Sequence, residues 1–238
     1  MLLRIFTNNG AGVTRESLIE LVSYLIALVV AITLHEVAHG LVALWNGDDT
    51  AKLAGRLSVN PVAHFDLFGF LMLLFVGFGW AKPVPVNPNN FKNKTAGKIT
   101  VSLAGVITNL LLAFLFSVLL VGMSGLYYNS SHGSSTYYIY WFLYTLGYYV
   151  TAINVSLALF NFLPLFPLDG YNFLASFISE DNKFLRFMRK YSLYILLVFV
   201  LWDMMPDSIS QFSPLNWYIG VLGGYIRLVF ARFWGLFF

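Results

Sequence analysis

The sequence predicts an all-α polytopic membrane protein, a bundle of about five to six transmembrane helices with a re-entrant hairpin between the first and second full spans. Composition is the first reason. Of the 238 residues, 58% are hydrophobic and 11% are charged, whereas a soluble domain usually carries about 25% charged residues. Long apolar runs are the second reason, because several approach the roughly 20 residues that cross a bilayer. We expect most of the outer surface to face lipid.

The apolar runs define the expected elements in order. Three are long enough for full spans: residues 17–45, 98–128 and 137–163. Residues 67–80 are apolar but short, which favours a re-entrant segment. Prolines at 83, 85 and 88 then forbid a regular helix, so residues 82–86 are expected to be extended. Further elements are a short helix at 171–178, an apolar helix at 191–205 that is somewhat short for a span, and a last helix at 215–238. We expect one transmembrane domain over 1–238, with a core at 17–178 and C-terminal helices at 184–238.

Basic residues alternate between the loops. They gather between the first two spans (Lys52, Arg56, Lys82, Lys92, Lys94 and Lys98) and after the third (Lys183, Arg186, Arg189 and Lys190), while residues 129–136 contain no Lys or Arg. The positive-inside rule therefore predicts a multi-pass cell-membrane protein whose first group of basic residues is cytoplasmic. The first and third spans then run in the same direction, from outside to inside.

Some functions are excluded by composition. The chain has no cysteine, so disulfides and thiolate metal ligands are excluded. The net charge of +3 is modest, and the basic residues do not alternate with aromatic residues along one face, so no nucleic acid is expected as a partner. A soluble enzyme is excluded by the apolar composition. The lipid bilayer is the expected environment.

The first span contains the segment HEVAH, from His35 to His39. On a helix, residues four apart share a face, so both imidazoles can reach one metal ion. Zinc at such a site lowers the pKa of water to about 7, and Glu36 lies where a carboxylate can take the proton. The alternative is a hydrogen-bonded histidine pair with a buried salt bridge. Ionisable residues inside an apolar helix are usually functional, which favours the metal site.

A catalytic zinc takes a third protein ligand and keeps one position open. His132 lies in the loop predicted to be outside, far from HEVAH. Asp169 follows the third span, at about the depth of the two histidines, although the same position suits an N-cap of the next short helix. His64 is on the correct side of the membrane, and a structural role, such as orienting a loop or a ligand, is favoured for it.

Several segments together resemble the site-2 protease family of intramembrane zinc metalloproteases, peptidase family M50. They are LHEVAHG, RLSVNPVAHFDLFG, GFGWAKPVPVNPNNF, SLAGVITN and FNFLPLFPLDG, which cover most of the chain from about Leu34 to Asn172. The closest likeness is to the short bacterial type without a PDZ or CBS domain. The family resemblance implies one Zn²⁺ per chain and hydrolysis of peptide bonds in transmembrane protein substrates, near the cytoplasmic face.

The resemblance also implies roles for single residues. It assigns Glu36 as the catalytic base and His35, His39 and Asp169 as the metal ligands. Asn161 matches an asparagine that contacts the substrate backbone, and Gly105 and Asn109 match a G-x-x-x-N element of the second span. Gly77, Phe78 and Gly79, with the extended stretch that contains Val84 and Pro85, resemble a re-entrant hairpin that can pair with a substrate strand. From the residues alone, Asn161 and Asn109 could equally satisfy a neighbouring carbonyl in the bundle.

This chain departs from the family pattern at two positions. Phe166 stands where a proline is common, with Pro167 beside it, and Val106 follows Gly105 where the family often has proline. Neither position is a proposed ligand, so the departures concern local backbone shape. Two other functions use the same His/Asp site: a metal transporter and a non-catalytic scaffold that binds membrane proteins. The sequence does not define the substrate, its regulation or the oligomeric state.

Overall fold

The computed structural model describes residues 14–75, 79–179 and 181–238. Within these residues every regular element is a helix and no β-strand is present, which confirms the predicted all-α class. Three of the described helices are long and apolar enough to cross a membrane. They correspond to the three predicted full spans. The total number of spans stays a prediction.

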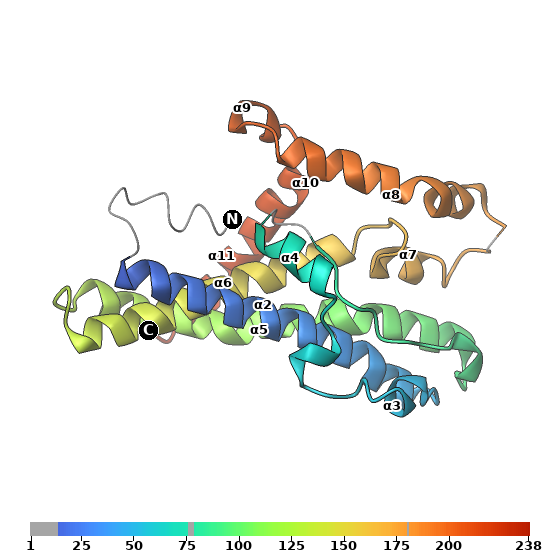
Figure 1. Cartoon of the computed structure of the whole chain (residues 1–238), viewed down its shortest axis with the longest axis horizontal. Helices are drawn as coiled ribbons and strands as arrows, with labels where there is room; N and C mark the ends of the chain where they lie inside the picture. The colour runs from blue at the N-terminus through green and yellow to red at the C-terminus, as the bar shows by residue number, and fades with distance from the viewer. Residues whose placement is uncertain (1–13, 76–78, 180) are drawn as a thin grey trace.

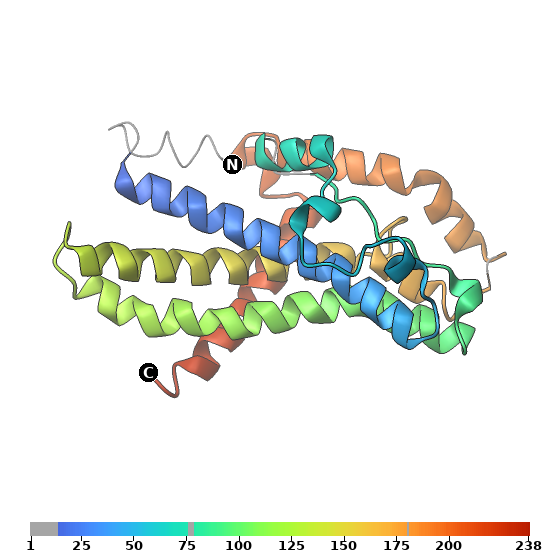
Figure 2. The ribbon, with the colours of Figure 1, turned by 60° about the horizontal axis from the view of Figure 1, so that its bottom comes forward.

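Three helices form the body of the molecule: α2 (Arg15–Trp45), α5 (Lys94–Tyr128) and α6 (Ser135–Asn161). They lie side by side along the long axis, with α2 and α6 running in one direction and α5 in the other (Figures 1 and 2). The shared direction of α2 and α6 is the one that the sequence predicts. It brings the C-terminal end of α6 to the same end of the bundle as the C-terminal half of α2.

Local sequence determines where these helices begin. Thr14, Asn93 and Ser134 precede α2, α5 and α6, and the side chain of each accepts a hydrogen bond from a backbone N–H of the first turn. Such N-caps satisfy donors that the helix itself leaves unpaired. The prolines at 164 and 167 prevent α6 from continuing.

Small and polar residues allow the three helices to approach closely. A Cβ at Gly147 would lie 2.6 Å from the backbone nitrogen of Leu120, so only glycine fits where α6 meets α5. The hydroxyls of Ser23 and Thr145 are 2.9 Å apart and join α2 to α6. These contacts are typical of helix association in lipid, where water does not drive apolar surfaces together. Large apolar side chains on the outside of α5, such as Leu111 and Leu115, are exposed, as a lipid-facing surface requires.

The connection from α2 to α5 makes an excursion beside the bundle. It contains α3 (Thr50–Leu53), a 3₁₀ turn at Pro61–Ala63 and α4 (Leu67–Phe75), and returns by residues 79–87 to a second 3₁₀ turn at Pro88–Asn90. An isolated antiparallel bridge between Phe65 and Ala81 joins the two ends of the excursion. The returning chain after Ala81 has no helix up to Asn87, as the prolines predict. Gly77 and Phe78 lie outside the described residues.

The C-terminal third begins with the short helix α7 (Asp169–Leu174), which packs against α5. Helix α8 (Lys183–Asp203) lies away from α2, α5 and α6, on the far side of α4 and α7 (Figure 1). It is joined to the chain after α6 by a hydrogen bond from the Phe166 N–H to Ser192 Oγ, 2.9 Å. Two short helices follow, α9 (Asp207–Ser210) and α10 (Pro214–Trp217). A π-helical turn (Tyr218–Leu222) then leads into α11 (Gly223–Trp234), which crosses α5 and α6.

Candidate metal centre and its cavity

Three side chains converge on one point between α2 and α7. His35 Nε2 and His39 Nε2 are 3.1 Å apart, and each lies 3.3 Å from Asp169 Oδ2. Within the described residues, this is the group of potential metal ligands whose donor atoms come this close together. The i, i+4 spacing accounts for the two histidines, and the parallel course of α2 and α6 brings Asp169 to their depth.

The three donor atoms suit a zinc ion. Tetrahedral zinc with bonds of about 2.0–2.1 Å separates its ligand atoms by roughly 3.3 Å, close to the three separations found here. Asp169 Oδ2 is buried and has no hydrogen-bond partner among the described residues, which is costly unless a cation faces it. Asp169 is the first residue of α7, and that helix has no side-chain N-cap bond. Asp169 therefore does not act as the N-cap of α7, the other role that its position suited.

Both histidines are oriented by a bond at the opposite ring nitrogen. His39 Nδ1 lies 2.8 Å from the carbonyl oxygen of Val101, and His35 Nδ1 lies 2.5 Å from Asn109 Oδ1. Because these two oxygens only accept, each Nδ1 carries the proton and each Nε2 presents its lone pair. Such outer partners fix the tautomer and the ring orientation of a metal ligand.

A buried asparagine in α6 supports this arrangement and was missed from the sequence. Asn154 Oδ1 accepts a hydrogen bond of 2.6 Å from Asn109 Nδ2, and Asn154 Nδ2 donates to the Val150 carbonyl at 2.8 Å. The amide of Asn109 is therefore held with its oxygen toward His35. The sequence did give a sign of Asn154, because a polar side chain in an apolar span must find a hydrogen-bond partner. The contacts of Asn109 support a role in positioning the His35 imidazole.

Gly105 of α5 lies directly against the two imidazoles. A Cβ at this position would lie 2.4 Å from His35 Cε1 and 2.6 Å from His39 Nε2. Real atoms do not approach so closely, and both neighbours are fixed by the bonds described above. The glycine therefore allows α5 to approach the site, and its contacts are with the two imidazoles.

Glu36 is held by the extended chain that follows the excursion. Its Oε2 accepts a hydrogen bond of 2.9 Å from the backbone N–H of Val84. The carboxylate lies one residue from His35, yet it does not belong to the converging ligand atoms. A carboxylate held by a backbone donor beside the three donor atoms, and not one of them, is placed where it could act on water at a metal bound there.

The ends of the extended chain are fixed as well. The buried carboxylate of Asp48 accepts hydrogen bonds from the Asn87 N–H at 2.7 Å and from Asn90 Nδ2 at 2.8 Å. At the other end, the Lys82 N–H donates to the His64 carbonyl at 2.9 Å, and its carbonyl accepts from Arg56 at 2.6 Å. Sequence reasoning did not identify Asp48 or Arg56 in these roles.

A large cavity opens onto the ligands. Its volume is about 1230 Å³, and its lining includes the ligands, Glu36, Val84, Val86 and Asn161. Asn161 Nδ2 donates to the Leu157 carbonyl of its own helix at 3.0 Å, which leaves the side-chain oxygen without a partner among the described residues. Pro85 is not among the lining residues of the described chain. Asn161 and Val84 therefore border the space that a substrate would enter.

The remaining histidines lie elsewhere. His64 is fully buried, and its Nε2 lies 2.7 Å from the Ser58 carbonyl, away from the ligand group. Its contacts are with the loop before α4, which agrees with the favoured structural role. His132 Nε2 pairs with Glu16 Oε1 at 3.6 Å, beside the N-terminal end of α2 and far from the ligands.

The fold and the site together define an α-helical membrane protein with a buried His–His–Asp centre suited to a metal. Residues 23–202 match the family model of Peptidase family M50. The chain belongs to this family. The site-2 protease likeness seen in the sequence is thereby confirmed.

Related proteins extend over most of the chain. "Putative zinc metalloprotease YwhC" of Bacillus subtilis is 39% identical over 220 residues, which cover 83% of this chain and 96% of that protein. "Putative zinc metalloprotease Rip2" of Mycobacterium tuberculosis is 27% identical over 220 residues, covering 88% of this chain and 80% of that protein. Rip2 of Mycolicibacterium smegmatis is 25% identical over 224 residues, with the same coverage. No solved structure matches the chain at the significance that these relatives reach.

Proposed function

We propose that the protein is an intramembrane zinc metalloendopeptidase that hydrolyses peptide bonds of transmembrane substrate proteins near the cytoplasmic side of the bilayer. The observation that carries this proposal is the convergence of His35, His39 and Asp169 beside a carboxylate, Glu36, that is held by a backbone donor. A metal transporter or a binding scaffold does not require a base fixed in that position.

His35, His39 and Asp169 would hold the zinc ion. When bound, zinc supplies a Lewis acid for a carbonyl and lowers the pKa of water. Glu36 takes the proton of the attacking water at Oε1, because Oε2 accepts from the Val84 N–H, and the water oxygen bonds to the scissile carbonyl carbon. The same carboxyl then gives the proton to the leaving nitrogen as the C–N bond breaks. The Val84 N–H keeps Glu36 in place throughout.

The substrate segment must be extended at the point of cleavage, because a helix pairs its own backbone groups and shields its carbonyls. The cavity volume exceeds the roughly 300–1,000 Å³ typical of small-molecule sites, which favours a peptide segment. Asn161 offers a free side-chain oxygen to a substrate N–H. The stretch with Val84 and Pro85 offers an extended backbone that a substrate strand can join.

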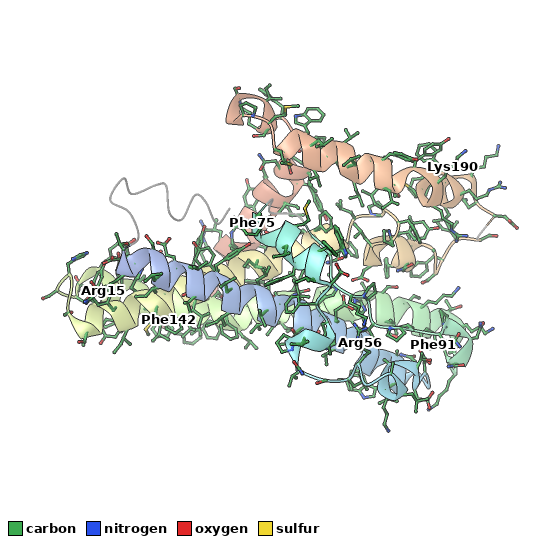
Figure 3. The ribbon with its side chains drawn as sticks, in the orientation of Figure 1. Arg15, Arg56, Phe75, Phe91, Phe142 and Lys190 are labelled. Carbon is green, nitrogen blue, oxygen red and sulfur yellow. The ribbon has the colours of Figure 1, made fainter. Side chains whose placement is uncertain are left out.

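The cytoplasmic side is supported by charge. Arg56 and Lys190 lie toward one end of the long axis and Arg15 lies toward the other (Figure 3). The first two belong to the basic groups that the positive-inside rule assigns to the cytoplasm. The ligands share that end of α2, so the active site would open there.

The test is cleavage of a transmembrane test substrate by the purified protein in lipid nanodiscs. We expect the wild type to cut and Glu36→Gln to lose nearly all activity while it keeps its zinc. Full activity of Glu36→Gln with metal bound would overturn the mechanism. Binding of substrate without cleavage in the zinc-loaded wild type would favour the scaffold, and zinc flux across liposomes would favour the transporter.

A further inference from the structure

The backbone of residues 82–87, here called the extended segment, has most of its donors engaged. The Lys82 N–H donates to His64, the Val84 N–H to Glu36 and the Asn87 N–H to Asp48. These bonds anchor both ends and the middle of the segment. It is therefore ordered before any ligand arrives, which lowers the entropy that binding costs.

In the part of the chain that the structure describes, one residue of the extended segment has both its backbone N–H and its backbone C=O unpaired. Residues 83 and 85 are prolines and have no N–H, so Val86 has the segment's one N–H without a partner among the described residues. The Val86 carbonyl has no partner there either, and neither does the Val84 carbonyl. Both valines line the cavity.

We propose that the extended segment binds the substrate backbone in a single register, through Val86 and the Val84 carbonyl. It would then select substrates by two N–H groups that lie two residues apart. The inference rests on the proposed function, because it takes an unwound transmembrane segment as the ligand. It goes beyond that function by specifying the register and a sequence restriction on the substrate.

Backbone direction selects the edge that is used. In an extended chain, the N–H and C=O groups of alternate residues point to the same edge. The Val84 N–H points to Glu36, so the edge of residues 84 and 86 faces the catalytic carboxylate. The opposite edge has only the carbonyls of Pro83 and Pro85 to offer. A strand on the valine edge is therefore held beside the base.

The two valines make different bonds. Val86 donates to one substrate carbonyl and accepts from one substrate N–H, whereas Val84 only accepts, because Glu36 occupies its donor. Paired positions along a strand recur every two residues, so the two substrate N–H groups are separated by one residue that makes no bond to the segment. Proline at either paired position removes the donor, while proline between them removes none.

The experiment measures binding separately from cleavage. The probe is a synthetic transmembrane peptide of leucine and alanine with a central Gly–Asn pair and a photoreactive group, added to the full-length protein in nanodiscs. In a series of peptides, the central amides are replaced one at a time by esters, which removes one N–H each. Crosslinking yield reports binding, and product analysis reports cleavage.

We expect two ester positions, two residues apart, to lower the apparent affinity by about two- to tenfold each, the usual effect of one lost hydrogen bond. The ester between them should lower it less, because it removes no donor and only weakens the carbonyl that accepts from Val86. This pattern supports the inference whether or not the peptide is cut, and absence of cleavage counts against the proposed function alone. A flat ester series, or no specific crosslink, overturns the inference even if the peptide is cleaved.

Variants of the protein test the same register. Val86→Pro removes the free donor and should bind about two- to tenfold more weakly than Val86→Ala, which shortens the same side chain but keeps the N–H. Pro85→Ala adds an N–H on the opposite edge, so the positions of the two sensitive esters should stay the same. If Val86→Pro binds normally, or if Pro85→Ala alters the ester pattern, the valine edge is the wrong one. Should Val86→Pro fail to fold, the ester series in the wild type decides.

Discussion

His35 Nδ1 lies 2.5 Å from Asn109 Oδ1, a contact between residues 74 positions apart in the chain. Asn109 in turn donates to Asn154, so the orientation of the His35 imidazole depends on three helices. Packing of the three-helix body therefore positions this proposed metal ligand, and a change in α6 would affect the site without touching it.

Replacing Asn109 by leucine should weaken zinc binding by about 10- to 100-fold, the usual effect of losing a ligand's outer partner. Asn154→Leu should weaken it less, because His35 keeps its bond while the Asn109 amide becomes free to turn. Competition for zinc against a chelator measures the zinc affinity of both variants. Thr151→Val is the matched control: Thr151 is equally buried and on the same helix, but it bonds to the Ala113 carbonyl. Equal affinities in all four proteins would contradict the positioning role.

Asp169→Ala should abolish stoichiometric zinc, while His64→Ala should retain about one ion per chain, since catalytic zinc uses three protein ligands. Asp169 Oδ2 faces both imidazoles, and the His64 ring bonds to Ser58. Metal content of the detergent-purified proteins decides. Zinc lost from the His64 variant but kept in the Asp169 variant would reverse the assignment.

Local patterns predicted the parts of the site that depend on one element or on span direction. The i, i+4 spacing gives His35 and His39, and the parallel course of the first and third spans brings Asp169 to the same depth. The Val84–Glu36 bond and the Asn154 contact depend on how separate elements pack, which no spacing in the sequence encodes. The same limit applies to Asp48, whose partners in the returning chain, Asn87 and Asn90, lie about forty residues away.

Gly105→Ala should reduce zinc binding strongly, because its Cβ would lie 2.4 Å from His35 Cε1. The imidazole cannot yield without losing its bond to Asn109. Gly125→Ala on the same helix is the control, since a Cβ there meets nothing within 4 Å. Zinc content and melting temperature of both variants should be measured together. An alanine at 105 that leaves zinc affinity unchanged would show that α5 moves aside without cost.

Acid should release the extended segment through Asp48. Burial raises the pKa of the Asp48 carboxyl, but hydrogen bonds from Thr50, Asn87 and Asn90 outweigh it and leave the pKa below its ordinary value of 3.8. A carboxyl with a lower pKa in the folded state stabilises the fold above the unfolded pKa, and this contribution is lost as the pH falls through the folded pKa. The Asn87 amide should therefore exchange its hydrogen slowly near neutral pH and lose protection, relative to intrinsic rates, below about pH 4.

Asp48→Asn provides the comparison for that measurement. The amide cannot accept as strongly as a carboxylate, so the variant should lose about 1–3 kcal/mol of local stability at neutral pH. It should also lose the acid dependence of Asn87 protection, because the carboxylate that accepts from the Asn87 N–H is gone. The Val84 amide should lose only part of its protection from hydrogen exchange, since Glu36 still accepts its hydrogen bond. If wild type and variant exchange alike at both pH values, Asp48 does not anchor the extended segment.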